Sequence, residues 1–379
     1  MQNSKSENLK LFYFLKSIAS LGDVRIRRIA EKYNNLGNLI SSDLQTLKSI
    51  DGISEKTLRE VECAINKSYE FEESYLKLLE RLEKSNIKVA TIFDENYPQN
   101  LKNIYDAPVI LYYYGNLGES DRYSISIVGT RTPSDYGRKV CRELSKELAN
   151  RGLPVISGLA IGIDSIAHNS CLESRGITYA VLGSGVDNLY PPDNKHLYER
   201  IKETGAVISE FDIGSKAEKV NFPRRNRVVS GISLGTLIVE SRIKGGSLIT
   251  AEFALDQNRE LFAIPGNINA KNSEGCNNLI KKGYAKLVSG VDDIISEFNI
   301  QISDLVNTKS NKIPETEQKE MNVFEQKIYN ALNDTEPISI DKICELTELN
   351  ISDCLVNLLT MEFKGLISQL PGKYFLKQR

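Results

Sequence analysis

The sequence predicts an α/β protein in which a parallel sheet covered by helices lies between two smaller, mostly helical modules. From about residue 87 to residue 298, short apolar runs alternate with amphipathic stretches of helical length, as expected for a parallel sheet with crossover helices. The residues before this region, and those after residue 320, show the apolar spacing of helices instead. A chain of 379 residues also favours two or three domains over a single core.

Residues 1–84 are predicted to form a helical domain. Apolar residues recur at three- and four-residue spacing, as they do at Leu11, Phe14, Leu15 and Ile18. Within this domain, Leu47–Val61 has the pattern of two short helices around Gly52, with Ser54 placed to cap the second. The segment resembles the helix-hairpin-helix unit, whose loop amides can hold a DNA phosphate. Such hairpins also serve as plain packing units, so both interpretations stay open.

Residues 85–300 are predicted to form the sheet domain. Eight strands are expected, at Val109–Tyr113, Ile125–Gly129, Pro154–Gly158, Thr178–Gly183, Ala206–Glu210, Gly235–Glu240, Glu260–Pro265 and Lys286–Ser289. Helices are expected between most of them, including Tyr136–Arg151, Ser247–Gln257 and Val291–Phe298. Glycines gather where the strands end, for example at Gly129, Gly158 and Gly245. Open α/β sheets bind ligands outside the carboxyl ends of their strands, so these glycines mark the expected binding edge.

The sheet domain contains a strongly basic segment. Phe222–Ser233 combines three arginines and an aromatic ring at the expected start of a helix. Between residues 216 and 244 there are seven Lys and Arg side chains against two carboxylates, although the formal net charge of the chain is only −2. A local positive field in a nearly neutral protein favours a polyanion such as nucleic acid bound in one defined cleft. The alternative is a solvated helix with scattered basic residues.

The C-terminal part begins with a linker and ends in a small domain. Residues 307–320 are almost entirely polar, which predicts a linker over residues 301–320. Residues 321–379 predict three helices, at Val323–Leu332, Ile340–Thr347 and Ile351–Lys364, then a β-hairpin turning at Pro371-Gly372. This is the order of a winged helix-turn-helix, which binds duplex DNA or serves as a protein-interaction unit. The third helix carries two acidic residues, Asp353 and Glu362, and one basic residue, Lys364. This charge balance leaves both interpretations open.

Several classes of function are disfavoured by missing motifs. A redox dinucleotide site requires G-x-G-x-x-G after the first strand, but the first turn here is Gly129-Thr-Arg-Thr-Pro-Ser. The chain has no G-x-x-x-x-G-K-[ST] phosphate loop, no C-x-x-C pair among its six cysteines and only two histidines. We therefore expect no cofactor and no metal. No apolar run approaches the length of a membrane helix, and the N-terminus is unlike a signal peptide, so a cytoplasmic location is expected.

Six motifs in the sheet domain resemble those of the DprA/Smf family of DNA-processing proteins. They are Ile127–Arg131, Ser157–His168, Ala180–Asp187 with Tyr190-Pro191, Phe222–Ser233, Gly245–Ala251, and Phe262–Gly266 with Gly275–Ile280. The helical N-terminal module and the winged helix also occur in many members. The resemblance implies an extended Rossmann-like domain that binds single-stranded DNA, forms a homodimer and loads the recombinase RecA during natural transformation. Single-strand-binding protein, which coats incoming strands, is a further implied partner.

The resemblance also assigns a strand-binding pocket. Its residues would be Gly129, Arg131, Ser157, Gly158, Lys219, Phe222, Arg224, Arg225, Asn226 and Arg227. Gly245-Gly246 stands where Ser-Gly is usual, and Ser230-Gly231 where Ala-Gly is usual, but neither departure removes a charge. The ring of Phe222 is expected to stack on a base. The alternative for Phe222 is a hydrophobic staple at the start of the following helix.

Two enzymatic interpretations compete with this one. Asp164 and His168 are one helical turn apart and would suit an acid–base pair, although a cap and a packed histidine are the simpler roles. The sheet domain is also similar to nucleotide phosphoribohydrolases with a Pro-Gly-Gly-x-Gly-Thr-x-x-Glu loop. Here Gly235-Thr236 is kept, but the Pro-Gly-Gly is absent and the acid, Glu240, is displaced. We therefore expect a binding protein and no enzyme. A transcriptional regulator acting through the winged helix would leave the central cleft unexplained.

Overall fold

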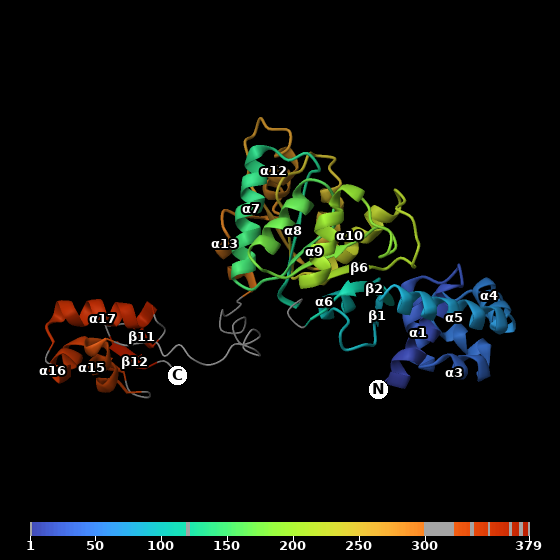
Figure 1. Cartoon of the computed structure of the whole chain (residues 1–379), viewed down its shortest axis with the longest axis horizontal. Helices are drawn as coiled ribbons and strands as arrows, with labels where there is room; N and C mark the ends of the chain where they lie inside the picture. Colours follow the sequence, from blue (N-terminus) through green and yellow to red (C-terminus); the bar gives the residue numbers. More distant parts are fainter. Residues whose placement is uncertain are drawn as a thin grey trace. The chain divides into compact units, whose positions relative to one another are not determined.

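The computed structural model describes residues 2–118, 122–298, 322–333, 337–347, 349–363, 366–370 and 374–377 (Figure 1). The chain divides into two compact units, residues 1–309 and 310–379. Among the helices of these described ranges, none is long and apolar enough to cross a membrane. The predicted linker, residues 301–320, lies outside the described residues.

The first unit begins with the predicted helical module. Its elements are α1 (Gln2–Lys16), α2 (Asp23–Tyr33), α3 (Leu36–Ser41), the 3₁₀ helix η1 (Leu44–Ser49), α4 (Glu55–Asn66) and α5 (Ser68–Lys84). Leu11, Phe14 and Leu15 of α1 are buried, as their spacing predicts. The hairpin around Gly52 has a 3₁₀ helix in its first arm, and Ser54 caps its second arm by accepting a hydrogen bond from the Thr57 amide.

Nine strands in the described part of this unit form one sheet. They are β1 (Lys88–Thr91), β2 (Ile110–Gly115), β3 (Ile125–Val128), β4 (Val155–Ser157), β5 (Thr178–Val181), β6 (Ala206–Ser209), β7 (Gly235–Ile238), β8 (Glu260–Ala263) and β9 (Lys286–Leu287), in the order β1-β2-β6-β5-β4-β3-β7-β8-β9. The seven strands from β6 to β9 in this order are parallel, which confirms the predicted fold class.

The edge formed by β1 and β2 departs from the prediction. Both pairings there are antiparallel, and β1 was not predicted at all. The first four residues of β2 are buried. A buried strand has a continuous apolar run whether it pairs in parallel or antiparallel, so the sequence does not reveal its direction. Strand direction depends on the connections, and those into and out of β2 are not crossovers with a long helix.

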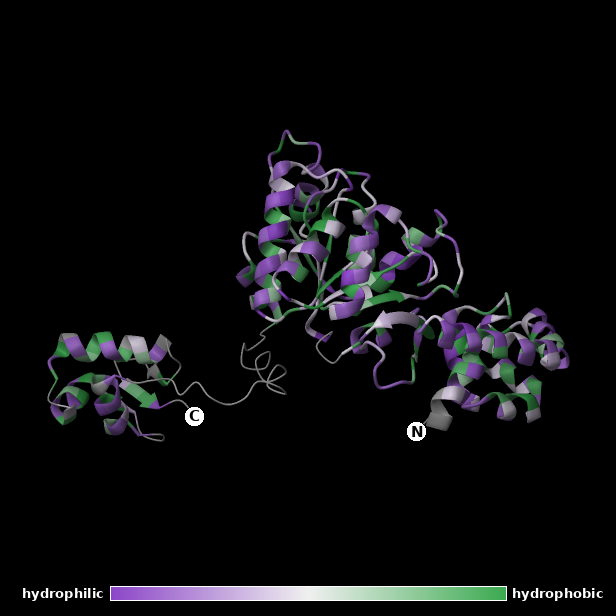
Figure 2. Ribbon diagram, in the orientation of Figure 1, coloured by the Kyte–Doolittle hydropathy of each residue, from purple (hydrophilic) through white to green (hydrophobic). Residues whose placement is uncertain are grey.

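Helices cover both faces of the sheet. They are the short helix α6 (Gln99–Lys102), then α7 (Asp135–Asn150), α8 (Ile163–Glu173), the 3₁₀ helix η3 (Pro192–Asn194), α9 (Lys195–Thr204), α10 (Asn221–Ile232), α11 (Ser247–Asp256), α12 (Glu274–Lys281), α13 (Val291–Ile295) and the 3₁₀ helix η4 (Ser296–Phe298). Side chains alternate between the faces: Ile127 packs with α7, α8 and α13, whereas Val128 packs in the cluster that contains α10 and α11. Figure 2 shows the inner strands as mostly hydrophobic and the helices as carrying hydrophilic residues as well.

The strand order creates a switch point beside β3. The chain moves from β3 outward through β4, β5 and β6, and then returns to the other side of β3 as β7. The loops that follow β3 and β7 therefore diverge and leave a crevice at the carboxyl ends of these strands. Such crevices are where open α/β sheets bind their ligands.

The second unit is a winged helix. Helices α15 (Val323–Ala331), α16 (Ile340–Thr347) and α17 (Ile351–Phe363) pack around Ile328, Ile343, Leu358 and Phe375. A sheet of β10 (Ile338–Ser339), β12 (Tyr374–Lys377) and β11 (Ile367–Leu370) completes it, with antiparallel pairing throughout. The predicted order of elements is confirmed, although β10 was not expected. Lys364 and the turn at Pro371-Gly372 lie outside the described residues.

His168 of α8 is a buried structural residue. Its Nδ1 lies 2.7 Å from the Thr178 hydroxyl, which donates its own proton to the Val155 carbonyl oxygen. The hydroxyl must therefore accept from Nδ1–H, which leaves Nε2 unprotonated; that atom is buried with no hydrogen-bond partner among the described residues. Burial, and secondarily the charge of Arg225, lowers the pKa of His168 from 6.5 to about 3.

We expect His168 to make the stability of the protein depend on pH. Between pH 6.5 and pH 3 the unfolded chain binds a proton that the folded protein excludes, so the free energy of unfolding falls as the pH falls. From pH 7 to pH 5, urea denaturation should show a loss about 2 kcal/mol larger for the wild type than for His168→Gln. Equal losses in the two proteins would show that His168 is not a buried neutral residue.

Candidate nucleic-acid interface

The crevice beside β3 forms a cleft with a volume of about 380 Å³, here called the switch-point cleft. It is lined by residues within segments 128–131, 158–164, 222–229 and 241–250. The first, second and fourth segments follow β3, β4 and β7, and the third is the first half of α10. Six of the ten predicted site residues line this cleft, namely Gly129, Arg131, Gly158, Phe222, Arg225 and Asn226.

Arg225 forms part of the floor of the cleft. Its side chain is buried, and its Nη1 donates to the carbonyl oxygens of Gly158, at 2.5 Å, and of Val181. Burial lowers the pKa of Arg225 to about 10, so it remains a cation at neutral pH. This contact explains why residue 158 is a glycine, because a Cβ atom there would lie 2.5 Å from an Arg225 nitrogen.

Asp164 balances part of this buried charge. Its Oδ2 accepts hydrogen bonds from the amides of Gly158, at 3.1 Å, and Ala160, at 3.4 Å, so it orders the loop after β4. Burial raises the pKa of Asp164, and the nearby Arg225 cation opposes that rise. Asp164 and His168 thus engage separate partners, which favours the structural roles for this pair over an acid–base pair.

Three cations stand at the rim of the cleft. Arg131, Arg242 and Lys244 all line it and are all exposed. Arg242 donates through Nε to the Asn272 amide oxygen at 3.3 Å, which ties the loop after β7 to the loop after β8. Arg242 and Lys244 were counted in the basic segment but were not assigned to the site. Their position just after β7, next to Gly245-Gly246, is the signal that could have placed them there.

Phe222 lies at one end of the cleft, against a second aromatic ring. The centroids of the Phe222 and Tyr190 rings are 5.6 Å apart, and 47% of Tyr190 is exposed. Phe222 is the second residue of α10, whereas a hydrophobic staple precedes its helix. The staple alternative is therefore not supported. Tyr190 was named only within one of the family motifs, and it was not assigned to the strand-binding pocket.

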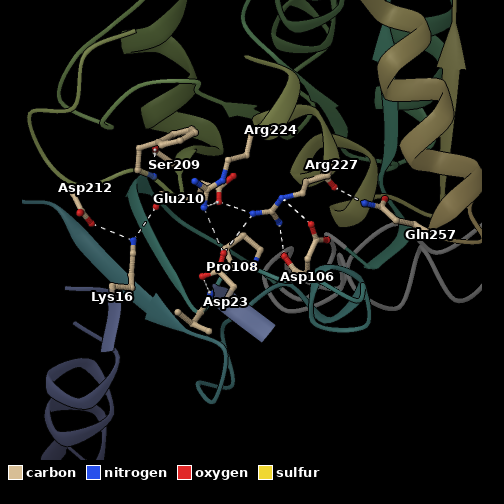
Figure 3. A network of polar contacts seen from close by, with 12 residues as sticks. Lys16, Asp23, Asp106, Pro108, Ser209, Glu210, Asp212, Arg224, Arg227 and Gln257 are labelled. Atoms are coloured by element: carbon tan, nitrogen blue, oxygen red, sulfur yellow. Dashed lines mark hydrogen bonds and ion pairs between the residues drawn. The ribbon is translucent and has the colours of Figure 1, made fainter. Parts of the chain in front are cut away.

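The other four predicted residues lie elsewhere. The Ser157 hydroxyl is buried and donates to the Ile127 carbonyl oxygen at 2.6 Å, joining β4 to β3. Lys219 is exposed on the connection that precedes α10. Arg224 and Arg227 extend from α10 into an ionic network with residues of the N-terminal module (Figure 3).

Arg227 is the centre of this network. Its Nη2 lies 2.5 Å from Oε2 of Glu210, and both side chains are at least 96% buried. Asp106 binds it as well, through a carboxylate oxygen 3.3 Å from Nε and a carbonyl oxygen 2.6 Å from Nη1. Burial raises the pKa of Glu210, which Arg227 counteracts. A guanidinium so enclosed has a structural role, so Arg227 acts on the cleft by holding α10.

Glu240, the acid considered for glycosidic cleavage, is committed to local structure. It accepts hydrogen bonds from the Ser134 amide at 2.9 Å and the Ser134 hydroxyl at 2.5 Å, which fixes the start of α7. It lines a different hollow, of about 580 Å³, together with residues 266–273. Within the described ranges, no group of three or more His, Cys, Asp or Glu side chains could hold a metal ion.

Comparison with protein-family models gives two matches. A model described as DNA recombination-mediator protein A matches residues 88–299, which is more than half of the chain. A model described as the DprA winged helix domain matches residues 315–373.

Individual relatives agree with these models. Protein Smf of Synechocystis sp. is 34% identical over 390 residues, covering 95% of this chain and 96% of the relative. DNA processing protein DprA of Streptococcus pneumoniae is 42% identical over 208 residues, covering 55% of this chain and 73% of the relative.

Solved structures of two such proteins also resemble this chain. DNA processing protein A of Streptococcus pneumoniae superposes with a TM-score of 0.65 at 32% identity, covering 76% of this chain and 97% of the other. That of Helicobacter pylori gives a TM-score of 0.51 at 30% identity, covering 56% and 96%. With the same sheet domain, the same winged helix and this level of identity along nearly its whole length, the chain belongs to the DprA/Smf family of DNA-processing proteins.

Proposed function

We propose that this protein binds single-stranded DNA in the switch-point cleft. The observation that carries the proposal is the combination, in one cleft at the strand ends, of three exposed cations and the ring of Phe222, which packs against the exposed ring of Tyr190 beside the cleft. Cations bind DNA phosphates whatever the base sequence, and aromatic rings stack on bases that are not paired. The relative from Helicobacter pylori is described as having a unique single-stranded DNA binding mode, which supports the same ligand here.

We assign the roles as follows. Arg131, Arg242 and Lys244 contact phosphates, with Lys219 as a further contact ahead of α10. Phe222 stacks on a base beside Tyr190. The second group of residues shapes the cleft and does not touch the strand: it comprises Gly129, Ser157, Gly158, Arg225, Asn226 and Arg227.

Processing of an incoming strand in natural transformation and recombination is the role that the family suggests. We propose that the protein acts there as a homodimer that loads RecA onto strands covered by single-strand-binding protein. A protein with these partners works in the cytoplasm. We further propose that it is no enzyme, because Glu240 is held by Ser134 outside the switch-point cleft.

The ligand can be tested by comparing a single-stranded oligonucleotide with its duplex at several salt concentrations and without nucleotide. We expect the single strand to bind more tightly, because only unpaired bases can stack on Phe222. With the three rim cations and Lys219 on phosphates, the logarithm of affinity should fall with the logarithm of salt with a slope of about −3. Equal affinity for the duplex, or an absolute need for ATP, would contradict the proposal.

Charge and stacking can be separated by mutation. Arg131→Ala and Lys244→Ala should each weaken binding and flatten the salt slope by about 0.7. Phe222→Ala should cost about 1–3 kcal/mol of binding free energy at an unchanged slope, because the ring carries no charge. Lys139→Ala is a matched control, since Lys139 is 72% exposed on α7 and does not line the cleft. Unchanged slopes for both cationic variants would show that the strand binds elsewhere.

Assembly and loading need their own measurement on the full chain. We expect light scattering at micromolar concentration to give the mass of a dimer. We also expect the wild type to speed RecA filament formation on DNA covered by single-strand-binding protein, and Arg131→Ala to do so less. A monomer without effect on RecA, in a protein that still binds single strands, would remove the loading role and leave the binding role intact.

A further inference from the structure

A second cleft lies on the other side of α10, where this helix faces the N-terminal module. Its volume is about 600 Å³, and we call it the junction cleft. It is lined by residues within segments 22–28, 51–52 and 105–106, by Arg224 and Arg227 of α10 and by Phe253. Among these residues, the sequence predicted DNA contact for the two arginines and left it open for the hairpin loop that contains Asp51 and Gly52. Nothing in the proposed function uses the cleft itself.

Two of its guanidinium groups come from α2. Arg25 is held in place, because its Nη1 donates to the Ser20 carbonyl oxygen at 3.0 Å and its Nε packs against Gly52, where a Cβ atom would lie only 2.8 Å away. Arg28 is freer: 42% of its side chain is exposed, and it lies 3.7 Å from Asp51, which is 95% exposed. An ion pair this long between exposed groups contributes little to stability, so Arg28 is available to bind another anion.

Arg224 supplies the third guanidinium. Its side chain is 56% exposed, and its Nη2 lies 3.4 Å from Glu210 and 3.6 Å from Asp23. Both distances exceed the 2.7–2.9 Å of a strong charge-assisted hydrogen bond. The Glu210 carboxylate is instead bound closely by Arg227. Arg224 can therefore turn toward a phosphate without breaking the buried pair.

An aromatic ring completes the cleft. Tyr105, in the loop between α6 and β2, lines the junction cleft and is 80% exposed. The cleft is lined by four guanidinium groups, of which Arg227 is enclosed in the ionic network. Exposed aromatic rings and cations in one cleft are the two features that sites for single strands combine. The Asp106 carboxylate lies 3.3 Å from Arg227, whereas Asp23 lies 3.6 Å from Arg224 and 3.7 Å from Arg227. A phosphate would therefore replace Asp51 beside Arg28 and Asp23 beside Arg224.

The two clefts meet at the first two turns of α10. Phe222, Arg225 and Asn226 line the switch-point cleft, while Arg224 lines the junction cleft. Successive helical residues point about 100° apart, so one turn reaches both clefts. We propose that the junction cleft is a second subsite for the same DNA strand, in which Arg28 and Arg224 bind its phosphates and Tyr105 stacks on a base. This inference rests on the proposed function of the switch-point cleft.

The length of the strand tests the proposal on the full chain. An oligothymidylate of about six nucleotides should fill the switch-point cleft alone, and one of about twenty should reach both clefts. We expect Tyr105→Ala to weaken binding of the long oligonucleotide about five- to tenfold, at an unchanged salt slope. Arg28→Ala should weaken it and flatten the slope by about 0.7. Neither variant should alter binding of the short oligonucleotide.

Controls come from the same module. Tyr69 on α5 is 85% exposed and Lys56 on α4 is 84% exposed, so Tyr69→Ala and Lys56→Ala match the two changes outside the cleft and should leave both affinities unchanged. Melting curves should be alike for all four variants, since the altered side chains are exposed.

The outcomes separate the two proposals. Unchanged affinity of Tyr105→Ala and Arg28→Ala for the long oligonucleotide would overturn the second subsite, as would an equal loss for both lengths. If Arg131→Ala still weakens binding of the short oligonucleotide in that case, the proposed function stands without the subsite. Failure of the wild type to bind either length would refute the proposed function and the subsite together.

Discussion

The buried ion pair between Arg227 and Glu210 fixes the helix on which both clefts depend. Glu210 follows β6, and Arg227 lies in the middle of α10, so the pair fastens the helix to the sheet. Two charges removed from water cost several kcal/mol each, and only close geometry with further hydrogen bonds offsets that cost. Asp106 and Asp23 supply the additional contacts, and Asp23 belongs to α2 of the N-terminal module. Loss of either partner would leave an uncompensated buried charge.

Lys16 extends this arrangement to α1. Its Nζ donates to the Glu210 carbonyl oxygen at 3.2 Å and lies 3.1 Å from the Asp212 carboxylate (Figure 3). The start of the connection between β6 and α10 is thereby attached to the N-terminal module. The end of the same connection carries Lys219 and leads into Phe222. The start of this connection and the helix that follows it are thus held by Lys16 and Asp23, which precede the sheet domain in the sequence.

Sequence patterns predicted the fold class and the edge of the sheet that holds the cleft, because strand alternation and glycines after strands are local signals. They did not predict how the arginines of α10 divide. Arg225 forms part of the floor of one cleft, whereas Arg224 and Arg227 line the other. Arg224 is exposed there, and Arg227 is enclosed by its pairing with Glu210. That division depends on Glu210 and Asp23, which are distant in the sequence. The direction of β2 and the pairing of Tyr190 with Phe222 were missed for the same reason.

The hydrophobic cluster on the α10 face of the sheet continues without a break into the N-terminal helices. It includes Leu11 and Phe12 of α1, Ala90 of β1 and Val228 of α10. The winged helix has a separate cluster of its own. Unfolding is cooperative over residues that share a core. We therefore expect the first 84 residues to melt with the sheet and not ahead of it, and a protease that cuts among them after partial opening would release the clefts from their support. The two compact units would then unfold as two cooperative parts, although the sequence predicts three domains.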